Sequence, residues 1–298
     1  MSPWSRSAWG GRFDATNVCR PLVSLITSIS YDHTRQLGPR LQDIAFEKSG
    51  IIKTGIPAIS GATHVEARSV IEIICRQRNA PLLQLGRDFD FQYVPASITA
   101  SSSRPARVTI RTPVRTWPTL QLGLLGEHQG ANAAVTVACV EQLRKCGLPI
   151  PDQAVAEGLA GVVWPARLEV LRTQPFVILD CAHNVASAQA LVDTLLASFP
   201  PSRRHLLFAG SKDKDIPGMF RVFAPHFVRC YLTRFTNNPR AASLEELQRI
   251  ATAQKMTAQT YPTSQQAWEA ASAQAAPDDL ICITGSVFLA GEMRRILL

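Results

Sequence analysis

Residues 176–195 read FVILDCAHNVASAQALVDTL, and this stretch decides the class of fold. It opens with four apolar residues, continues with a polar run from Asp180 to Asn184, and then carries apolar residues at helical spacing. That order predicts a buried strand, a short turn and a helix. In an open parallel sheet, ligands bind beyond the carboxyl ends of the strands, where the next helix offers free backbone N–H groups. The stretch therefore places Asp180, His183 and Asn184 at a candidate binding edge.

Helix capping is the alternative explanation for the polar side chains of this turn. Asp and Asn are preferred N-cap residues, so capping would explain either Asp180 or Asn184 if that residue stood alone. Three different polar side chains within five residues favour a binding site over a simple cap.

The same alternation of strand and helix continues from this stretch to the last residue. Further strands are expected at 205–209, 228–233, 259–261 and 280–284, and helices at 185–199, 217–223, 243–254, 265–275 and 287–297. Regular alternation of this kind predicts a mostly parallel sheet with helices on both faces. Polar residues follow three strand ends, at 180–184, 210–215 and 284–286, and their shared position favours function over turns and caps.

The earlier part of the chain predicts a second α/β region with a less regular pattern. Strands are expected at 22–29, 56–60 and 81–85, and helices at 41–50, 65–78 and 126–146. Residues 89–122 are rich in Ser, Thr, Arg and Pro and alternate between polar and apolar around Val108. This composition and alternation predict antiparallel strands in a hairpin-like excursion.

A segment with glycine and proline marks the expected domain boundary. Before it, Asp152 is expected to cap a short helix that ends at Leu159. Residues 161–165 read GVVWP, and Gly and Pro punctuate regular structure, so this segment is interpreted as a linker. The expected domains are therefore 1–165 and 166–298, both of the α/β class.

Composition indicates a folded protein with a preference for small anionic ligands. The 298 residues are 46% hydrophobic and 18% charged, so we expect a sizeable buried core and no global disorder. The net charge of +8 comes from basic residues spread singly along the chain, which argues against a nucleic-acid partner. A positive field suits an anionic substrate such as a nucleotide or a polycarboxylate, although surface charge alone explains the balance equally well.

Cysteine usage and hydropathy indicate the compartment. The seven cysteines form no Cys-x-x-Cys pair and no spacing typical of a metal site. Their odd number and their scatter favour a reducing environment. No apolar run reaches the length of a membrane span, and the first twenty residues lack the apolar centre of a signal peptide. We therefore expect a soluble, cytoplasmic protein without a membrane partner.

Lys48 and its surroundings form a candidate metal site. Lys48 stands among apolar residues in DIAFEKSGIIK at 43–53, where a lysine is most often a surface residue that keeps its ammonium group in water. Asp32 and His33 follow the first predicted strand and offer a carboxylate and an imidazole. Mg²⁺ is usually bound by few protein groups together with phosphates, so a divalent metal site is the functional alternative.

Two further side chains are candidates for contact with a nucleotide. Asn132 lies in the first turns of the helix that opens with GEHQ at 126–129, where polar groups suit an anion or a purine edge. Capping by the Glu or Gln of that segment is the alternative. Arg167 follows the Trp-Pro linker, and its planar guanidinium is suited to phosphate.

Eight segments make the chain resemble the folylpolyglutamate synthase / dihydrofolate synthase family, within the Mur-ligase-like ATP-dependent amide ligases. They are GGRFDATN (10–17), ITSISYDHTRQLG (26–38), IAFEKSGIIKTGIP (44–57), GEHQGANAA (126–134), WPARLEVL (164–171), LDCAHN (179–184), GSKDKD (210–215) and TGSVFLAGE (284–292). Each alone is weak, but eight in family order are highly specific and cover essentially the whole chain. The resemblance implies an incomplete P-loop-NTPase-like Mur-ligase central domain followed by a Rossmann-like C-terminal domain.

The resemblance also implies a reaction. In this family a folate-side carboxylate is activated by phosphoryl transfer from MgATP, and the amino group of L-glutamate attacks the acyl phosphate to give an amide, ADP and phosphate. The acceptor is a folate, dihydropteroate or both, so the implied process is folate biosynthesis and one-carbon metabolism. The implied cofactors are ATP and Mg²⁺, the implied partners are these small molecules, and the implied state is a monomer. Positioning and electrostatics would supply most of the catalysis.

Five residues match the family's metal and nucleotide contacts by position. His33 resembles a histidine ligand of Mg²⁺, and Lys48 resembles a lysine that carries a carbamate, which would turn a cation into an oxygen donor for metal. Asn132 and Arg167 resemble ATP contacts, with Arg167 on the phosphates. Asp180 resembles the acidic residue of the nucleotide site in the C-terminal domain. The resemblance implies that all five surround one magnesium-nucleotide.

Two more residues match positions next to the family's glutamate site. His183 falls in the turn that adjoins bound glutamate, and Ser286 falls in a nearby loop. The implied catalytic group consists of Lys48, His183 and Arg167.

The chain departs from the family pattern in three places. Family members carry a glycine-rich phosphate loop of the GTNGKGS type before GGRFDATN, and none of the six lysines here follows a glycine. Arg6 stands where the family has a glutamate that binds Mg²⁺. Cys181 replaces a glycine, which is expected to strain a position that favours positive φ. These departures predict an amino-terminally truncated member with impaired activity.

Two other functions are alternatives. A non-catalytic remnant of such a ligase would bind nucleotide or glutamate through its C-terminal domain. A nucleotide-dependent oxidoreductase on a Rossmann sheet belongs to a different class, and the absence of a Gly-x-Gly-x-x-Gly segment after a strand argues against it.

Overall fold

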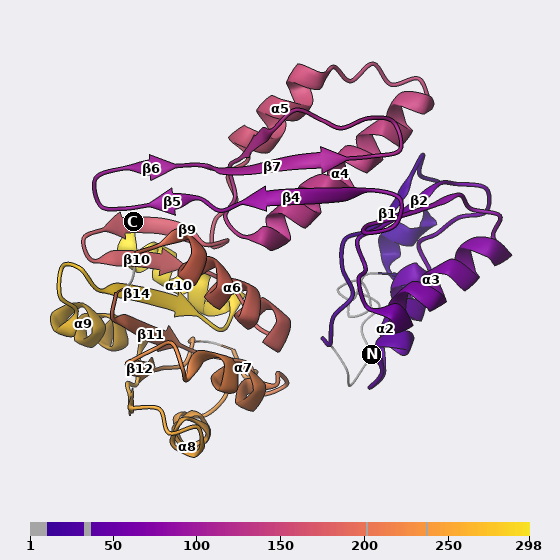
Figure 1. Cartoon of the computed structure of the whole chain (residues 1–298). Coiled ribbons are helices and arrows are strands. Elements are labelled where there is room, and N and C mark those ends of the chain that lie inside the picture. Colours follow the sequence, from indigo (N-terminus) through magenta and orange to yellow (C-terminus); the bar gives the residue numbers. More distant parts are fainter. Residues whose placement is uncertain (1–10, 33–36, 201, 237) are drawn as a thin grey trace. The chain divides into compact units, whose positions relative to one another are not determined.

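Figure 1 shows the chain as a computed structural model that describes residues 11–32, 37–200, 202–236 and 238–298. The chain forms two compact units, each with a hydrophobic core of its own. Unit 1 comprises Met1–Val94, Arg107–Gly123 and Glu127–Val162, and unit 2 comprises Pro95–Ala106, Leu124–Gly126 and Val163–Leu298. From Val163 onward the chain stays in unit 2.

Unit 2 is built on a six-stranded sheet in the order β13-β12-β11-β14-β10-β9. The strands are β9 (Glu169–Thr173), β10 (Phe176–Leu179), β11 (Arg204–Phe208), β12 (Arg229–Leu232), β13 (Ala258–Thr260) and β14 (Leu280–Thr284). β9 pairs antiparallel with β10, and the other pairs are parallel. The predicted mostly parallel sheet is thereby confirmed. β9 was not expected, because its sequence EVLRT has no continuous apolar run.

Helices cover both faces of this sheet (Figure 1). They are α6 (Val185–Ser198), α7 (Ile216–Phe223), α8 (Leu244–Ala253), α9 (Ser264–Gln274) and α10 (Val287–Leu297). Leu207 of β11 packs in one core cluster with Trp268 of α9 and Met293 of α10. The next residue, Phe208, points to the opposite face and packs against Phe220 of α7, with ring centroids 4.9 Å apart. Because both faces are covered, β10 and β14 are buried at every residue, as expected of continuous apolar runs.

Unit 1 contains a three-stranded parallel sheet in the order β1-β2-β3. Its elements are the 3₁₀ helix η2 (Ala15–Val18), β1 (Ser24–Ile26), α2 (Leu41–Ser49), β2 (Ala58–Ser60), α3 (Val65–Gln77) and β3 (Leu82–Gln84). Ile26, Ile44 and Ile71 meet in one buried cluster, which joins β1, α2 and α3. The parallel strands and both helices expected here are therefore present.

The middle of the chain forms antiparallel strands followed by two helices. These elements are β4 (Asp90–Val94), β5 (Ser97–Ile98), β6 (Ser103–Arg104), β7 (Ala106–Arg111), β8 (Leu120–Leu122), α4 (Glu127–Lys145) and α5 (Asp152–Gly161). β7 alternates between buried and more exposed residues, as its sequence predicts. Gly130 lets α4 lie against β4, since an added Cβ would stand 3.0 Å from Phe91 and 3.1 Å from Tyr93. Within the described residues, no helix has the length and apolar character needed to cross a membrane.

The role expected of Asp152 is wrong in detail. Pro151 occupies the N-cap position of α5, and Asp152 is the first residue of the helix. The Asp152 carboxylate instead accepts hydrogen bonds from Arg115 at 2.5 Å and from Arg144 at 2.9 Å. Two arginines from other elements therefore outcompete the local backbone for this side chain, and the helix runs on to Gly161.

The strain expected at Cys181 is not found there. Non-glycine residues with positive φ in the described chain are Asn79, Ala166, Leu168 and Lys255, and Cys181 is not among them. Two of these residues flank Arg167, so the strained backbone of unit 2 includes the loop that carries this arginine.

Candidate functional site

The carboxyl edge of the unit 2 sheet collects three polar loops. β10 runs into Asp180, β14 runs into Gly285 and Ser286, and β11 runs into the 210–215 loop. β11, β14 and β10 are adjacent and parallel, so their carboxyl ends lie side by side. The edge is therefore where side chains from distant parts of unit 2 meet.

Asp180 joins two loops through its carboxylate. Its side chain is buried, with Oδ1 accepting from the Ala182 N–H at 2.7 Å and Oδ2 accepting from the Leu168 N–H at 2.9 Å. Burial raises the pKa of Asp180, and the two N–H groups together with the charges of Arg167 and His183 offset this rise only in part. Asp180 is thus not a helix cap but a buried cross-link between the β10 turn and the 166–168 loop.

Arg167 is presented on a narrow loop beside Asp180. Ala166 and Leu168 are buried, whereas Arg167 between them is exposed. The φ angles of Ala166 and Leu168 are 56° and 47°, a region that residues with a Cβ rarely adopt. The two buried neighbours hold the backbone while the guanidinium stays accessible. Neither conformation has a signal in the sequence, since positive φ most often coincides with glycine or asparagine.

His183 and Asn184 complete the turn after β10. The Nδ1 atom of His183 lies 2.9 Å from the carbonyl oxygen of Cys181. Asn184 is the N-cap of α6, and its Oδ1 accepts from the Ser187 N–H at 2.8 Å, while Ser187 Oγ accepts from the Asn184 N–H in return. The capping explanation therefore holds for Asn184 and fails for Asp180.

Ser286 is fixed at the start of α10. It is buried, and its Oγ accepts from the Phe288 N–H at 3.1 Å, which makes Ser286 the N-cap. The preceding Gly285 has φ 112°, and an added Cβ would stand 2.5 Å from the Ala209 carbonyl oxygen and from the Phe208 ring. Only glycine fits at position 285, because the backbone there lies against the end of β11. Ser286, the next residue, is therefore held close to the end of that strand.

The loop after β11 is braced by the loop after β12. The backbone N–H of Lys212 donates to the Arg240 carbonyl at 2.9 Å, and the Arg240 guanidinium reaches both oxygens of Asp213 at 3.2 and 3.0 Å. Asp215 caps α7 by accepting from the Gly218 N–H at 2.8 Å. The polar run GSKDKD is therefore partly structural, and Lys212 remains exposed at the edge.

Two predicted site residues belong to unit 1 and lie on different helices. Lys48 is half-buried in the last turn of α2. Asn132 is half-buried near the start of α4, and its Nδ2 donates to Gln129 Oε1 at 3.0 Å, while Gln129 Nε2 lies 3.1 Å from His128 Nε2. The start of α4 thus carries a chain of side-chain hydrogen bonds. Nucleotide contact by Asn132 stays a prediction.

The metal role predicted for His33 and Lys48 involves one residue that the structure does not describe. Within the described ranges, no group of three or more His, Cys, Asp or Glu side chains is arranged to hold a metal ion. His33 lies outside the described residues, and the ammonium group of Lys48 is a hydrogen-bond donor and not a ligand. A carbamate on Lys48 would provide oxygen donors, so the metal role of this pair stays a prediction.

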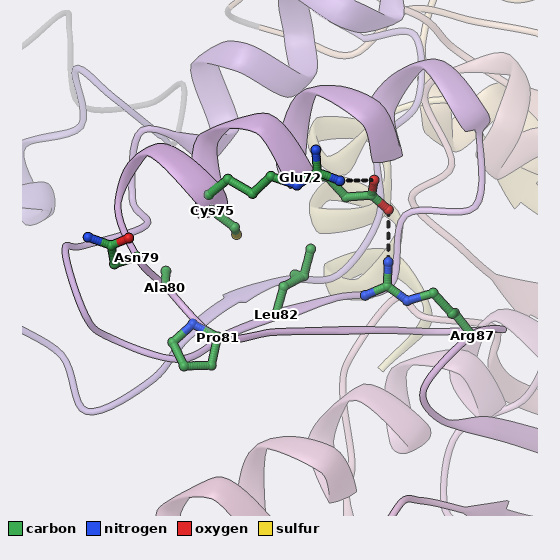
Figure 2. Close-up of a pocket in the computed structure, with 8 residues that line it drawn as sticks. Glu72, Cys75, Asn79, Ala80, Pro81, Leu82 and Arg87 are labelled. Carbon is green, nitrogen blue, oxygen red and sulfur yellow. Dashed lines mark hydrogen bonds and ion pairs between the residues drawn. The ribbon is translucent and has the colours of Figure 1, made fainter.

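A pocket of about 560 Å³ lies elsewhere in unit 1 (Figure 2). It is lined by the second half of α3, the segment after it, the start of β3, and Arg87 in the loop that follows β3. The carboxylate of Glu72 binds Arg87 at 2.9 Å and lies 3.9 Å from Arg76. Burial raises the pKa of Cys75 to about 11, so this thiol is protonated at neutral pH. No residue of the predicted site lines the pocket.

Comparisons with known proteins match the second part of the chain to a family model and nearly the whole chain to individual relatives. Residues 166–287 match the family "Mur ligase, glutamate ligase domain". The chain is 31% identical over 292 residues to the dihydrofolate synthase/folylpolyglutamate synthase of Bacillus subtilis and 32% identical over 291 residues to the folylpolyglutamate synthase of Lacticaseibacillus casei. Each match covers 97% of this chain and 65% of the relative, so the chain spans about two thirds of the length of these proteins.

Solved structures give the same family. The folylpolyglutamate synthase of Mycobacterium tuberculosis complexed with ADP and AMPPCP matches with a TM-score of 0.86 and 30% identity, over 97% of this chain and 66% of that one. Escherichia coli FolC in complex with DHPP and ADP matches with a TM-score of 0.85 and 28% identity, over 97% of this chain and 64% of that one. The resemblance inferred from the eight segments is confirmed: the chain belongs to the folylpolyglutamate synthase / dihydrofolate synthase family of Mur-ligase-like proteins.

Proposed function

We propose that this chain acts as an ATP-dependent ligase that adds L-glutamate to a folate, to dihydropteroate or to both. The observation that carries the proposal is the carboxyl edge of the unit 2 sheet, where Asp180, His183 and Ser286 follow adjacent parallel strands. Arg167 joins them through the bond between the Leu168 N–H and Asp180. Relatives named for this reaction match along 97% of the chain, which supports the proposal.

Arg167 is the proposed contact to the nucleotide phosphates. Its guanidinium is exposed, and a planar fork of N–H donors suits bidentate binding of phosphate oxygens. Both oxygens of Asp180 accept backbone N–H bonds, so we assign Asp180 the task of fixing the Arg167 loop in the nucleotide site. Asn132 is the proposed contact to the nucleotide in unit 1. The ADP complexes of the Mycobacterium tuberculosis and Escherichia coli relatives support a nucleotide as ligand.

His183 is proposed to receive the amino group of glutamate. A carbonyl oxygen only accepts hydrogen bonds, so the contact with Cys181 requires the hydrogen on Nδ1 of His183. The half-buried imidazole ring of His183, in the turn after β10, is the group proposed to meet the incoming amine. Ser286 is proposed to lie beside the same substrate, since it follows β14, the strand next to β10, and caps α10.

The reaction forms one amide bond and consumes one ATP. Phosphoryl transfer to the folate-side carboxylate gives an acyl phosphate and ADP, and attack by the glutamate nitrogen forms the C–N bond and expels phosphate. Arg167 would balance phosphate charge, and the net charge of +8 favours the approach of anionic substrates. Lys48, His183 and Arg167 form the proposed catalytic group.

A divalent metal, Mg²⁺, is proposed to neutralise phosphate charge when bound near His33 and Lys48. A relative from Yersinia pestis complexed with AMPPNP and a Mn ion supports a divalent metal in this family. We also infer a cytoplasmic location and a monomeric state. All seven cysteines are free, which fits a reducing compartment.

The test is incorporation of radiolabelled glutamate by the 298-residue chain, with Mg²⁺ and with tetrahydrofolate or dihydropteroate as acceptor. We expect labelled conjugate only when ATP is present. Arg167→Ala is expected to lower the rate by about 100-fold or more, because a charge-balancing arginine acts in the phosphoryl-transfer step. Arg295→Ala is the matched control, since Arg295 lies on α10 and bonds the Gly291 carbonyl of its own helix. It should keep the rate within about twofold.

The outcomes separate three cases. Turnover that depends on ATP and on Arg167 supports the ligase. Nucleotide binding without turnover would favour a non-catalytic remnant that binds through unit 2. A chain that neither turns over nor binds ADP would contradict the proposal.

A further inference from the structure

The two residues that flank Arg167 each donate a backbone hydrogen bond to a carboxylate. Asp180 accepts the Leu168 N–H at 2.9 Å, and Glu169 accepts the Ala166 N–H at 2.8 Å through Oε2. The two residues tied in this way are the ones with φ of 56° and 47°. An alanine in this region costs about 1 kcal/mol relative to ordinary backbone, so each hydrogen bond offsets strain at the residue it holds.

Glu169 is itself held by the last helix. Arg294 of α10 donates from Nε to both carboxylate oxygens at 3.1 Å and from Nη2 to Oε1 at 2.9 Å. The two side chains are 20% and 39% exposed, so the pair is partly shielded from solvent. Burial alone would raise the pKa of Glu169, but the bonds from Arg294 and from the Ala166 N–H lower it below its usual value. Glu169 is therefore a charged bridge between α10 and the Arg167 loop.

The two ends of α10 reach two parts of the proposed site. Ser286 caps the start of this helix, and Arg294 lies in its last turn. One rigid element thus sets the place of Ser286 at the carboxyl edge and, through Glu169, the conformation of the loop around Arg167.

We propose that Glu169, braced by Arg294, is a positioning residue for Arg167 and thereby for the phosphates of the bound nucleotide. This proposal rests on the nucleotide role proposed for Arg167. Without the Glu169 carboxylate, the Ala166 N–H loses this acceptor, and the hydrogen bond no longer offsets the strained φ of Ala166. The backbone then relaxes toward negative φ, which swings the base of the Arg167 side chain away from Asp180.

The test is a double-mutant cycle on ADP affinity, measured by isothermal titration calorimetry on the full chain. Arg167→Ala and Glu169→Ala are each expected to weaken binding about fivefold to tenfold, and Arg294→Met about threefold. The double variant R167A/E169A should bind no more than about twofold worse than R167A, because Glu169 acts only through Arg167. Glu169→Gln keeps an oxygen for the Ala166 N–H and should recover most of the affinity, and Arg295→Ala should match the wild type.

The outcomes distinguish a failure of the positioning role of Glu169 from a failure of the proposed function. Wild-type affinity in E169A, or additive losses in R167A/E169A, would overturn the positioning role while leaving the proposed function intact. A wild-type chain that does not bind ADP would contradict the proposed function and the role of Glu169 with it. Thermal unfolding of every variant shows whether the protein is folded at the titration temperature. Should E169A fail to fold, R294M takes its place in the cycle with R167A, and E169Q remains the control that keeps the acceptor for the Ala166 N–H.

Discussion

Unit 1 and unit 2 hold their predicted site residues in different ways. In unit 2, Asp180 and Ser286 are buried, and Asp180 receives backbone N–H groups from two loops. In unit 1, Lys48 and Asn132 are half-buried, and the Asn132 side chain donates to Gln129 of its own helix. The difference teaches that the carboxyl edge of unit 2 is preorganised by contacts distant in sequence, whereas the unit 1 side chains rely on their helices for position.

The largest effect is expected at Gly285, where the preorganised edge allows no side chain. Gly285→Ala adds a Cβ 2.5 Å from a backbone oxygen at φ 112°, so we expect a loss of stability of about 3 kcal/mol or more. Gly291→Ala on α10 is the matched control, because nothing lies within 4 Å of the added Cβ. It should stabilise the protein by about 0.5–1 kcal/mol through helix propensity. Urea unfolding measures both, and equal effects would show that the edge is not tightly packed.

The next effect is expected at Asp180. Asp180→Ala leaves the N–H groups of Leu168 and Ala182 without their acceptor in a buried place, at a cost of about 2–3 kcal/mol. Asp193→Ala on α6 is the control, since Asp193 is exposed and accepts a hydrogen bond from Gln189 of the same helix. It should change stability by less than about 0.5 kcal/mol. An effect of D180A as small as that of D193A would remove the distinction between the two units.

A smaller, pH-dependent effect is expected at Glu169. Its pKa in the folded chain lies below the usual 4.5, so its stabilisation is present above pH 4.5 and is lost as the pH falls through the folded pKa. Glu169→Gln should lower the melting temperature by about 2–4 °C at pH 7. The gap to the wild type should close as the pH falls below 4.5. A gap that stays constant down to pH 3 would mean that the charge of Glu169 is not what binds Arg294.

The smallest effect on stability is expected at Lys48. Lys48→Met keeps the length of the side chain in the last turn of α2 and should change stability by less than about 0.5 kcal/mol. The same variant should abolish glutamate incorporation, because the proposed carbamate cannot form. Destabilisation above about 1 kcal/mol would instead show that Lys48 is held as firmly as the unit 2 residues.

Much of the fold follows from local patterns. FVIL before the polar turn predicts β10, and the apolar spacing after Asn184 predicts α6, because both elements bury side chains in a regular period. These patterns do not predict β9, because it is an edge strand on which no residue is fully buried. The sequence predicts a cap at Asp152, because the local pattern carries no sign that Arg115 and Arg144 compete for its carboxylate.

The candidate site was less accessible to sequence reasoning. The sequence predicts Asp180 at the carboxyl edge, where the structure has it. Its partner Leu168 lies 12 positions earlier and is bonded through its backbone N–H, so the residue type at 168 gives no sign of the contact. The Glu169–Arg294 pair spans 125 positions. Positive φ at Ala166 occurs without the glycine that normally signals it. Tertiary hydrogen bonds therefore decide the conformation of the Arg167 loop, and local propensity does not.

The most direct measurement is chemical-shift mapping of the isotopically labelled chain during titration with ADP. A nucleotide site at the carboxyl edge of unit 2 should perturb the amides of Arg167, Leu168, Ala182 and His183 most strongly, in proportion to bound ADP. Perturbations confined to the pocket beside Glu72 and Arg87, or the absence of shifts at every ADP concentration of the titration, would contradict a nucleotide site at this edge.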